Sequence, residues 1–217
     1  MTDYRCDATT VEGFVQQLAV NYVGHGYFFY VTGVIPANKD PRAVDQKLIA
    51  KYRIGISKWA RMRRKALGMA SVQYIRHGRF YVLLATHGKH LFFQPEDQGG
   101  EGDQVKDLRR VPLKFASYSI GHRGGHPHVA IERGTYLELK SYLLGLAVHR
   151  SREVLEREFW NLPFEPYAPV RRQLVTMFKV VNERRGTAGL EVLDMSCLRL
   201  RRRICRPFEA TPAVGGS

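Results

Sequence analysis

Residues 27–35, Tyr-Phe-Phe-Tyr-Val-Thr-Gly-Val-Ile, constrain the fold of this 217-residue chain more than any other segment. They are almost continuously aromatic or β-branched, which is typical of a strand buried in the middle of a sheet. A proline-bounded turn follows, and Pro41 suits the first position of one long helix that we expect to reach about residue 67. The apolar stripe of this helix would consist of Val44, Leu48, Tyr52, Ile56 and Trp59.

Further strands and helices are expected along the rest of the chain. Residues 70–76 and 80–85 predict a hairpin, residues 91–93 continue the β pattern, and a second hairpin is expected around residues 121–125. Residues 94–107 form an acidic, glycine-rich loop. Helices are expected over residues 136–148, 151–160 and 169–185, and the arginine-rich segment 198–206 resembles an exposed strand.

This order of elements predicts an α+β fold with a largely antiparallel sheet, either ferredoxin-like or similar to an RNA-recognition motif, with helices on one face. We expect an α+β core over residues 1–160. Residues 161–210 would hold a proline-rich linker, a helix and the arginine-rich strand, and residues 211–217 a disordered tail.

The chain is strongly basic, with a formal net charge of +14. Such a charge predicts a polyanionic partner, and nucleic acid explains it better than an anionic membrane. The sequence leaves open DNA or RNA, single-stranded or structured. The candidate contacts lie in two clusters: Lys51, Arg53, Lys58, Arg61, Arg63, Arg64 and Lys65, and Arg199, Arg201, Arg202, Arg203 and Arg206.

Other features bound the class of protein. No apolar run approaches the ~20 residues of a membrane span, so no membrane partner is expected. The three cysteines, Cys6, Cys197 and Cys205, are widely spaced and form no CxxC pair. This pattern argues against a disulfide framework or a structural zinc site and favours a reduced, cytoplasmic setting.

Two histidine groups are candidate metal ligands. His87 and His90 follow the strand expected over residues 80–85, and His126-Pro-His128 is a His-x-His pair. In a strand, side chains at i and i+2 point to the same face, so such a pair can hold one divalent ion beside a phosphodiester. The alternative is a turn whose histidines face water or phosphates.

Tyr136 and Lys140 are candidate catalytic residues. Four residues apart on a helix, they are neighbours on one face, where the tyrosine could attack a phosphate and the lysine could stabilise the developing charge. The alternative is that Tyr136, Leu139 and Leu143 form an apolar stripe and Lys140 is solvated.

The early apolar strand, the basic helix, the strand ending in histidines and the later helical tyrosine together resemble the HUH family of single-strand DNA nickases. This family includes rolling-circle replication initiators and small tyrosine transposases. Residues 82–93 are similar to the strand that carries the family's His-x-His, although the two histidines here are three apart and Gly88 stands where the first ligand belongs. The resemblance implies a ferredoxin-like catalytic domain, a Mg²⁺ or Mn²⁺ ion on two histidines, and a 5′-phosphotyrosine intermediate.

Two other functions fit the same residues. One is a non-catalytic RNA- or DNA-binding subunit of a ribonucleoprotein. The other is a metal-independent endoribonuclease with a histidine as general base.

Overall fold

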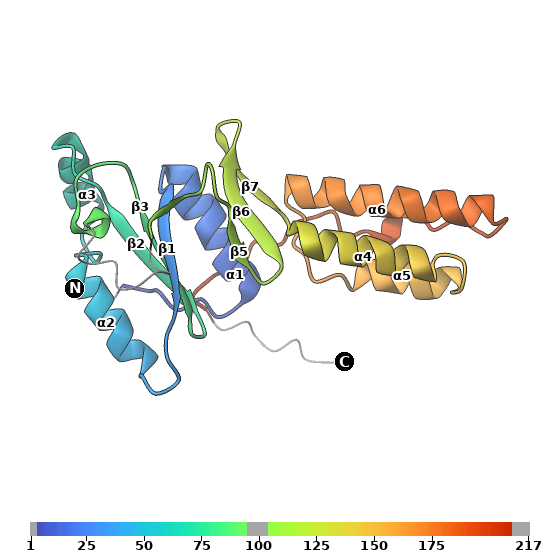
Figure 1. Cartoon of the computed structure of the whole chain (residues 1–217), viewed down its shortest axis with the longest axis horizontal. Helices are drawn as coiled ribbons and strands as arrows, with labels where there is room; N and C mark the ends of the chain where they lie inside the picture. Colours follow the sequence, from blue (N-terminus) through green and yellow to red (C-terminus); the bar gives the residue numbers. More distant parts are fainter. Residues whose placement is uncertain (1–3, 95–103, 210–217) are drawn as a thin grey trace. The chain divides into compact units, whose positions relative to one another are not determined.

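The computed structural model describes residues 4–94 and 104–209, which belong to two compact units (Figure 1). The first unit contains the chain up to Pro112, the short segment Gly121–Pro127 and the residues from Cys205 on. The second contains Leu113–Ile120 and His128–Ile204. The proline-rich segment 161–167 therefore lies inside the second unit and does not join two units.

The first unit is built on a four-stranded antiparallel sheet with the order β2-β3-β1-β4. Its strands are β1 (Phe29–Val34), β2 (Val72–His77), β3 (Phe80–Ala85) and β4 (Lys106–Asp107). The apolar run at residues 27–35 thus supplies an inner strand, paired with β3 on one side and β4 on the other. The hairpin expected from residues 70–85 is also present, with His77 opposite Phe80.

This arrangement confirms the α+β class and the antiparallel pairing. The helical connection from β1 to β2, with β3 between them, is half of a ferredoxin-like arrangement. Between β3 and β4, the described residues hold only a 3₁₀ turn, Leu91–Phe93, and no second helix.

Helices lie on both faces of this sheet, and not on one face as expected (Figure 1). Helix α1 (Val11–Gln16) continues as a π-helical turn, Gln17–Tyr22, and a 3₁₀ turn, Val23–His25. Its Phe14 ring contacts His77 and Phe80 on one face. Helix α2 (Pro41–Lys51) places Asp45 against Tyr74, which points to the other face because strand side chains alternate.

The single long helix predicted over residues 41–67 is wrong. The chain forms two helices, α2 and α3 (Lys58–Ala66). Between them, Arg53 has a positive φ of 48°, while its neighbours Tyr52 and Ile54 are both buried. Ser57 then begins α3, because its hydroxyl accepts a hydrogen bond from the Ala60 N–H. The chain therefore turns at Arg53 and the helix ends, because this turn lets both neighbouring side chains be buried.

The β pattern expected at residues 91–93 is also wrong, since the His90 side chain accepts a hydrogen bond from Phe92 N–H and begins the 3₁₀ turn. Phe92 is buried in the core on the α2 side of the sheet. Of the loop predicted over residues 94–107, residues 95–103 lie outside the described part. Its last two residues form β4, paired with Phe29 and Tyr30.

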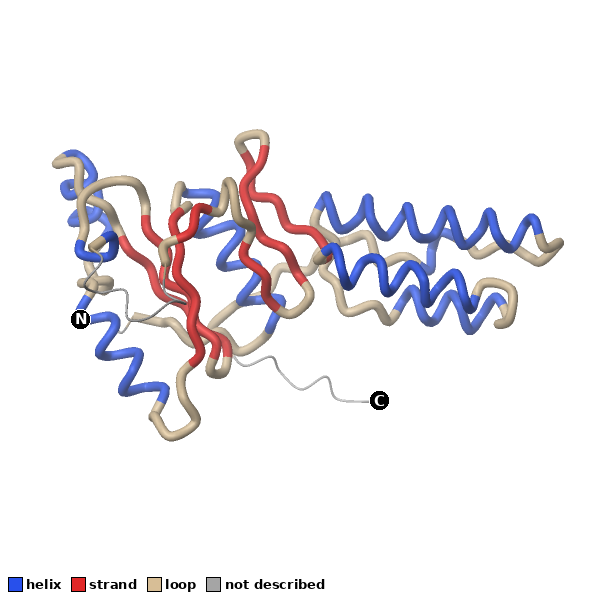
Figure 2. The backbone as a smooth tube through the Cα atoms, in the orientation of Figure 1, coloured by secondary structure: helices blue, strands red, loops and turns tan. Residues whose placement is uncertain are grey.

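The second unit combines a small sheet with three helices (Figure 2). Strands β5 (Leu113–Phe115), β6 (Tyr118–Arg123) and β7 (His126–Ile131) form a three-stranded sheet, whose β6–β7 turn belongs to the first unit. Helices α4 (Arg133–Leu146), α5 (Arg152–Trp160) and α6 (Ala168–Thr187) follow, close to the predicted ranges. Phe159 of α5 contacts Phe178 of α6 ring to ring.

The arginine-rich segment is not a strand. After the 3₁₀ turn Met195–Cys197, the chain runs irregularly. Arg199 donates to the Leu162 carbonyl and the Arg203 N–H donates to Glu165, so contacts with a loop replace a ladder to a neighbouring strand. The tail predicted over residues 211–217 lies outside the described part. No helix among the described residues is long and apolar enough to cross a membrane.

Candidate nucleic-acid interface

Helix α3 presents its apolar side chains to solvent. None of its nine residues is buried, and Trp59 is 71% exposed and Met62 55% exposed. Trp59, Met62 and Ala66 share one face, because positions i, i+3 and i+7 coincide on a helix. The half-buried residues Ala60, Arg61 and Arg64 lie on the other side. The prediction that Trp59 belongs to a core-facing stripe is therefore wrong.

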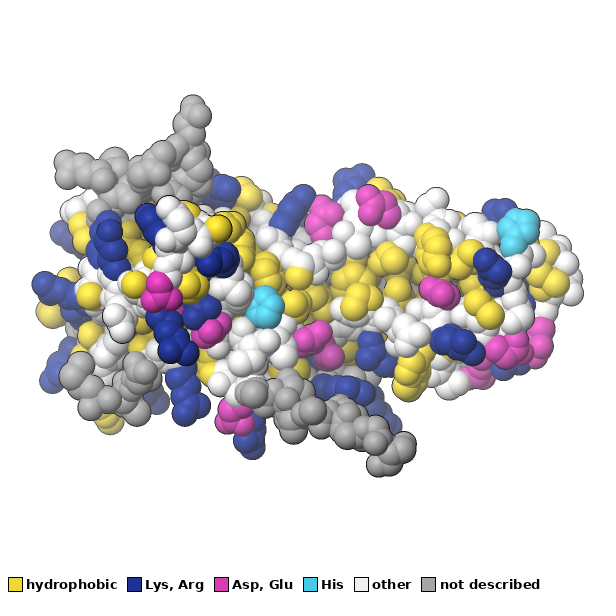
Figure 3. Space-filling view, turned by 90° about the horizontal axis from the view of Figure 1, so that it is seen from below, with side chains coloured by type: hydrophobic (Ala, Val, Ile, Leu, Met, Phe, Trp, Pro, Cys, Tyr) yellow, Lys and Arg dark blue, Asp and Glu magenta, His cyan; other side chains and the backbone are white. Residues whose placement is uncertain are grey.

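The same helix concentrates positive charge that the protein itself does not neutralise. Five of its nine residues are lysine or arginine, and none is acidic. Within the described ranges 4–94 and 104–209, Lys58, Arg63, Arg64 and Lys65 form no ion pair with a carboxylate. Further lysine and arginine side chains surround α2, on the face of the first unit that Figure 3 shows. Like charges this close repel one another, so the surface is suited to an anion.

The second basic cluster is more occupied by contacts within the protein. Arg199 donates to the Leu162 carbonyl at 2.5 Å, and Arg202 lies over the Tyr167 ring at 5.1 Å. Arg206 pairs with Glu209. Arg199, Arg201, Arg202 and Arg203 belong to the second unit, whereas Arg206 belongs to the first with the 51–65 cluster. Of the two clusters, the one on α3 has fewer of its cations engaged in contacts that the structure describes.

The predicted metal ligands do not form one cluster. Among the described residues, no group of three or more histidine, cysteine or carboxylate side chains is placed to hold a metal ion. His87 and His126 are exposed. His90 is engaged in the structure, because its Nδ1 accepts from Phe92 N–H at 3.0 Å. Burial, together with the nearby Arg64 and Arg53 cations, lowers the pKa of His90 despite a hydrogen bond with the Tyr52 backbone.

Gly88, at the position of the absent first histidine, cannot be replaced without strain. Its φ is +135°, and a Cβ atom there would lie 2.6 Å from the Ala70 nitrogen. The local backbone thus excludes any side chain at this position.

Tyr136 and Lys140 lie on α4, both half-buried and one turn apart, as predicted. They belong to the second unit, whereas His87, His90 and His126 belong to the first; His128 falls in the second. The proposed catalytic pair and most of the proposed metal ligands are therefore supplied by different units.

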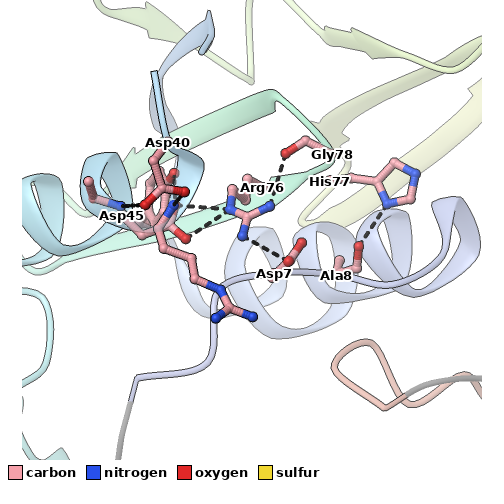
Figure 4. A network of polar contacts seen from close by, with 10 residues as sticks. Asp7, Ala8, Asp40, Asp45, Arg76, His77 and Gly78 are labelled. Carbon is pink, nitrogen blue, oxygen red and sulfur yellow. Dashed lines mark hydrogen bonds and ion pairs between the residues drawn. The ribbon is translucent and has the colours of Figure 1, made fainter. Parts of the chain in front are cut away.

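A buried ion network on the α2 face of the sheet escaped the sequence analysis (Figure 4). Arg76 of β2 donates from Nε to both carboxylate oxygens of Asp45, at 3.0 and 2.9 Å. Its Nη2 pairs with Asp7 at 2.8 Å, and its Nη1 donates to the Gly78 carbonyl. The Tyr74 hydroxyl donates to Asp45 at 2.6 Å. Every charged member therefore has a partner, as burial requires.

The buried Cys6 thiol lies beside this network. Burial raises the pKa of Cys6 to about 12, and the neighbouring Asp45 carboxylate adds to the shift. A raised pKa keeps the thiol protonated at neutral pH and disfavours its reaction as a nucleophile.

Two aromatic side chains of the β2–β3 hairpin are packed against other residues of the first unit. Tyr74 is fully buried, and the half-buried Phe80 packs edge-on against Phe14. Trp59, in contrast, is an aromatic side chain exposed to solvent. The sequence does carry a signal for this exposure: Gly55 and the capping residue Ser57 interrupt the helical pattern just before Trp59.

Comparisons with known proteins give no relative: no family model matches the sequence, and no curated protein matches it significantly.

Proposed function

We propose that the first unit binds nucleic acid through α3. The observation that carries this proposal is the combination of unpaired cations and outward-facing apolar side chains on one exposed helix. A solvated surface helix normally turns its apolar stripe toward the core. On α3, Trp59 and Met62 point away from the protein and stand among Lys58, Arg63 and Lys65.

The cationic and the aromatic side chains of α3 would contact different parts of a nucleic acid. Lysine and arginine neutralise phosphates and release condensed counterions. An exposed tryptophan offers a flat surface on which an unpaired base stacks, worth about 1–3 kcal/mol per base. We therefore propose single-stranded nucleic acid, or the unpaired region of a folded one, as the preferred ligand.

The proposal is tested by titrating fluorescent single-stranded and duplex oligonucleotides at several salt concentrations. The triple variant K58Q/R63Q/K65Q should weaken binding to both, and the slope of log K against log salt should fall by about two to three. Trp59→Ala should weaken binding to the single strand by about 1–3 kcal/mol and leave duplex binding nearly unchanged.

A charge-matched control separates α3 from the general positive charge of the chain. The variant K39Q/K47Q/K106Q removes three exposed cations of the same unit, and it should change affinity and salt slope less than the α3 triple variant. Equal effects of the two triple variants would refute α3 as the contact. Binding to anionic vesicles but not to oligonucleotides would assign the helix to a membrane surface instead.

The tyrosine nickase remains a prediction about a further activity. Its signature would be a covalent protein–DNA adduct that forms with Mg²⁺ or Mn²⁺ and is lost in Tyr136→Phe. Binding without an adduct would leave the first unit as a non-catalytic module.

A further inference from the structure

A further candidate site lies in the first unit and has no residue of α3 in its lining. It is a cavity of about 590 Å³, within the size range of small-molecule sites. Its walls come from four segments far apart in sequence: residues 4–7 at the N-terminal end, helix α2 with Arg42, Asp45, Gln46 and Ile49, Arg76 of β2, and Phe208 near the C-terminal end.

One wall of the cavity is the Asp45–Arg76 network, which fixes its charge and shape. Arg76 and Asp45 are each only 6% exposed. Arg76 uses its three nitrogen atoms on Asp45, Asp7 and the Gly78 carbonyl. This wall is therefore preorganised and needs no ligand to satisfy it.

The exposed part of the cavity lining has charged groups without such partners among the described residues. Arg5 and Arg42 are both exposed, and neither forms an ion pair with a carboxylate in the described part of the chain. Counting Arg76, three arginines and two aspartates line the cavity, so its formal charge is positive. A guanidinium group matches a phosphate in geometry and charge, donating two parallel hydrogen bonds.

The remaining lining is suited to a flat, partly apolar group. Tyr4, Ile49 and Phe208 supply half-buried apolar surface, and Gln46 is an exposed amide that can donate and accept. Phosphate-binding guanidiniums next to aromatic and aliphatic walls are the complement of a nucleotide: an anionic phosphate joined to a planar base.

We propose that this cavity binds a nucleoside 5′-phosphate, with Arg5 and Arg42 on the phosphate and the base against Tyr4, Ile49 and Phe208. The ligand is either a free mononucleotide or the 5′-phosphorylated end of a strand. The cavity shares no residue with α3, so this proposal stands or fails independently of the proposed function.

The test uses the full chain and the nucleoside 5′-monophosphates, the matching nucleosides and inorganic phosphate as probes in calorimetric titrations. We expect the monophosphates to bind more tightly than either the nucleosides or phosphate. Arg5→Gln with Arg42→Gln should weaken this binding by at least about tenfold, the loss expected for a charged hydrogen bond. Both side chains are exposed, so an unchanged melting temperature should show that the variant is folded.

The triple variant K58Q/R63Q/K65Q serves as the matched control, since it should lose strand binding but bind monophosphates as the parent does. Pentanucleotides with a 5′-phosphate or a 5′-hydroxyl distinguish the two sources of the ligand. Displacement of a bound monophosphate only by the phosphorylated strand identifies a strand end, and no displacement by either identifies a free nucleotide. Absence of monophosphate binding at about 1 mM, or equal affinity in the arginine variant, would overturn the proposal.

Discussion

Asp45 is a buried acid that holds two neighbouring side chains in the interior of the first unit. Its carboxylate accepts from Arg76 and Tyr74 and is 6% exposed, whereas the Asp7 side chain, the other partner of Arg76, is 56% exposed. Removing one partner from a buried ion pair strands the other charge, at a cost of about 3–5 kcal/mol. An exposed partner contributes about 1 kcal/mol or less.

We therefore expect Asp45→Ala to lower the free energy of unfolding by about 3 kcal/mol or more, and Asp7→Ala by about 1 kcal/mol or less. Urea unfolding followed by circular dichroism measures both values. Similar losses in the two variants would mean that Asp45 does not anchor Arg76. The sequence offered no means of finding this pair, because residues 45 and 76 meet only when α2 packs on β2.

At the scale of secondary-structure elements, the sequence located the strands of the main hairpin, the inner strand and the later helices, but not the break in the first long helix. The strand pattern located β1, β2 and β3 to within two residues, and the proline at position 169 lies in the first turn of α6. The expected helix over residues 41–67 broke because Tyr52 and Ile54 enter the core. Periodicity alone does not show which residues a sheet will bury.

Two glycines, one in a connection and one in a helix, test how strongly the local backbone restricts the side chain. Gly88 lies in the connection after β3 with a φ of +135° and backbone atoms within 3 Å of any added Cβ. Gly145 lies in α4, where an added Cβ meets no atom within 4 Å. We expect Gly145→Ala to stabilise the protein by about 0.5–1 kcal/mol, through lower chain entropy in the unfolded state.

The same change at Gly88 should destabilise the protein by more than this amount, because the backbone must move or strain. Thermal unfolding of the two variants measures both effects. Stabilisation by Gly88→Ala would show that the connection adopts another conformation in solution.

At the scale of the whole molecule, the two ends of the chain belong to one unit. Residues from Cys205 on contact the N-terminal helix: Gln16 exchanges hydrogen bonds with the Cys205 backbone, and Thr9 N–H donates to the Pro207 carbonyl. The space at Gly13 is filled by Pro207, whose Cα atom would lie 2.8 Å from an added Cβ. The C-terminal residues therefore hold α1 in place.

A chain that ends at residue 204 should accordingly lose stability in the first unit, although it retains the whole sheet. The loss of these three hydrogen bonds amounts to about 1.5–4.5 kcal/mol if each contributes about 0.5–1.5 kcal/mol. Melting temperatures of chains 1–204 and 1–209 provide the comparison, and the longer chain should melt at the higher temperature. Equal melting temperatures for the two chains would refute the role of residues 205–209.

The sequence by itself determined the α+β class, the inner strand, the main hairpin, the three later helices and the excess of positive charge. These properties follow from local patterns, such as alternation, helical spacing and capping residues, which are legible over a few residues. Tertiary structure decided the break before α3, the outward position of Trp59, the Asp45–Arg76 network and the cavity beside it. Each of these depends on which distant segments pack together, and local patterns in a single sequence do not record that information.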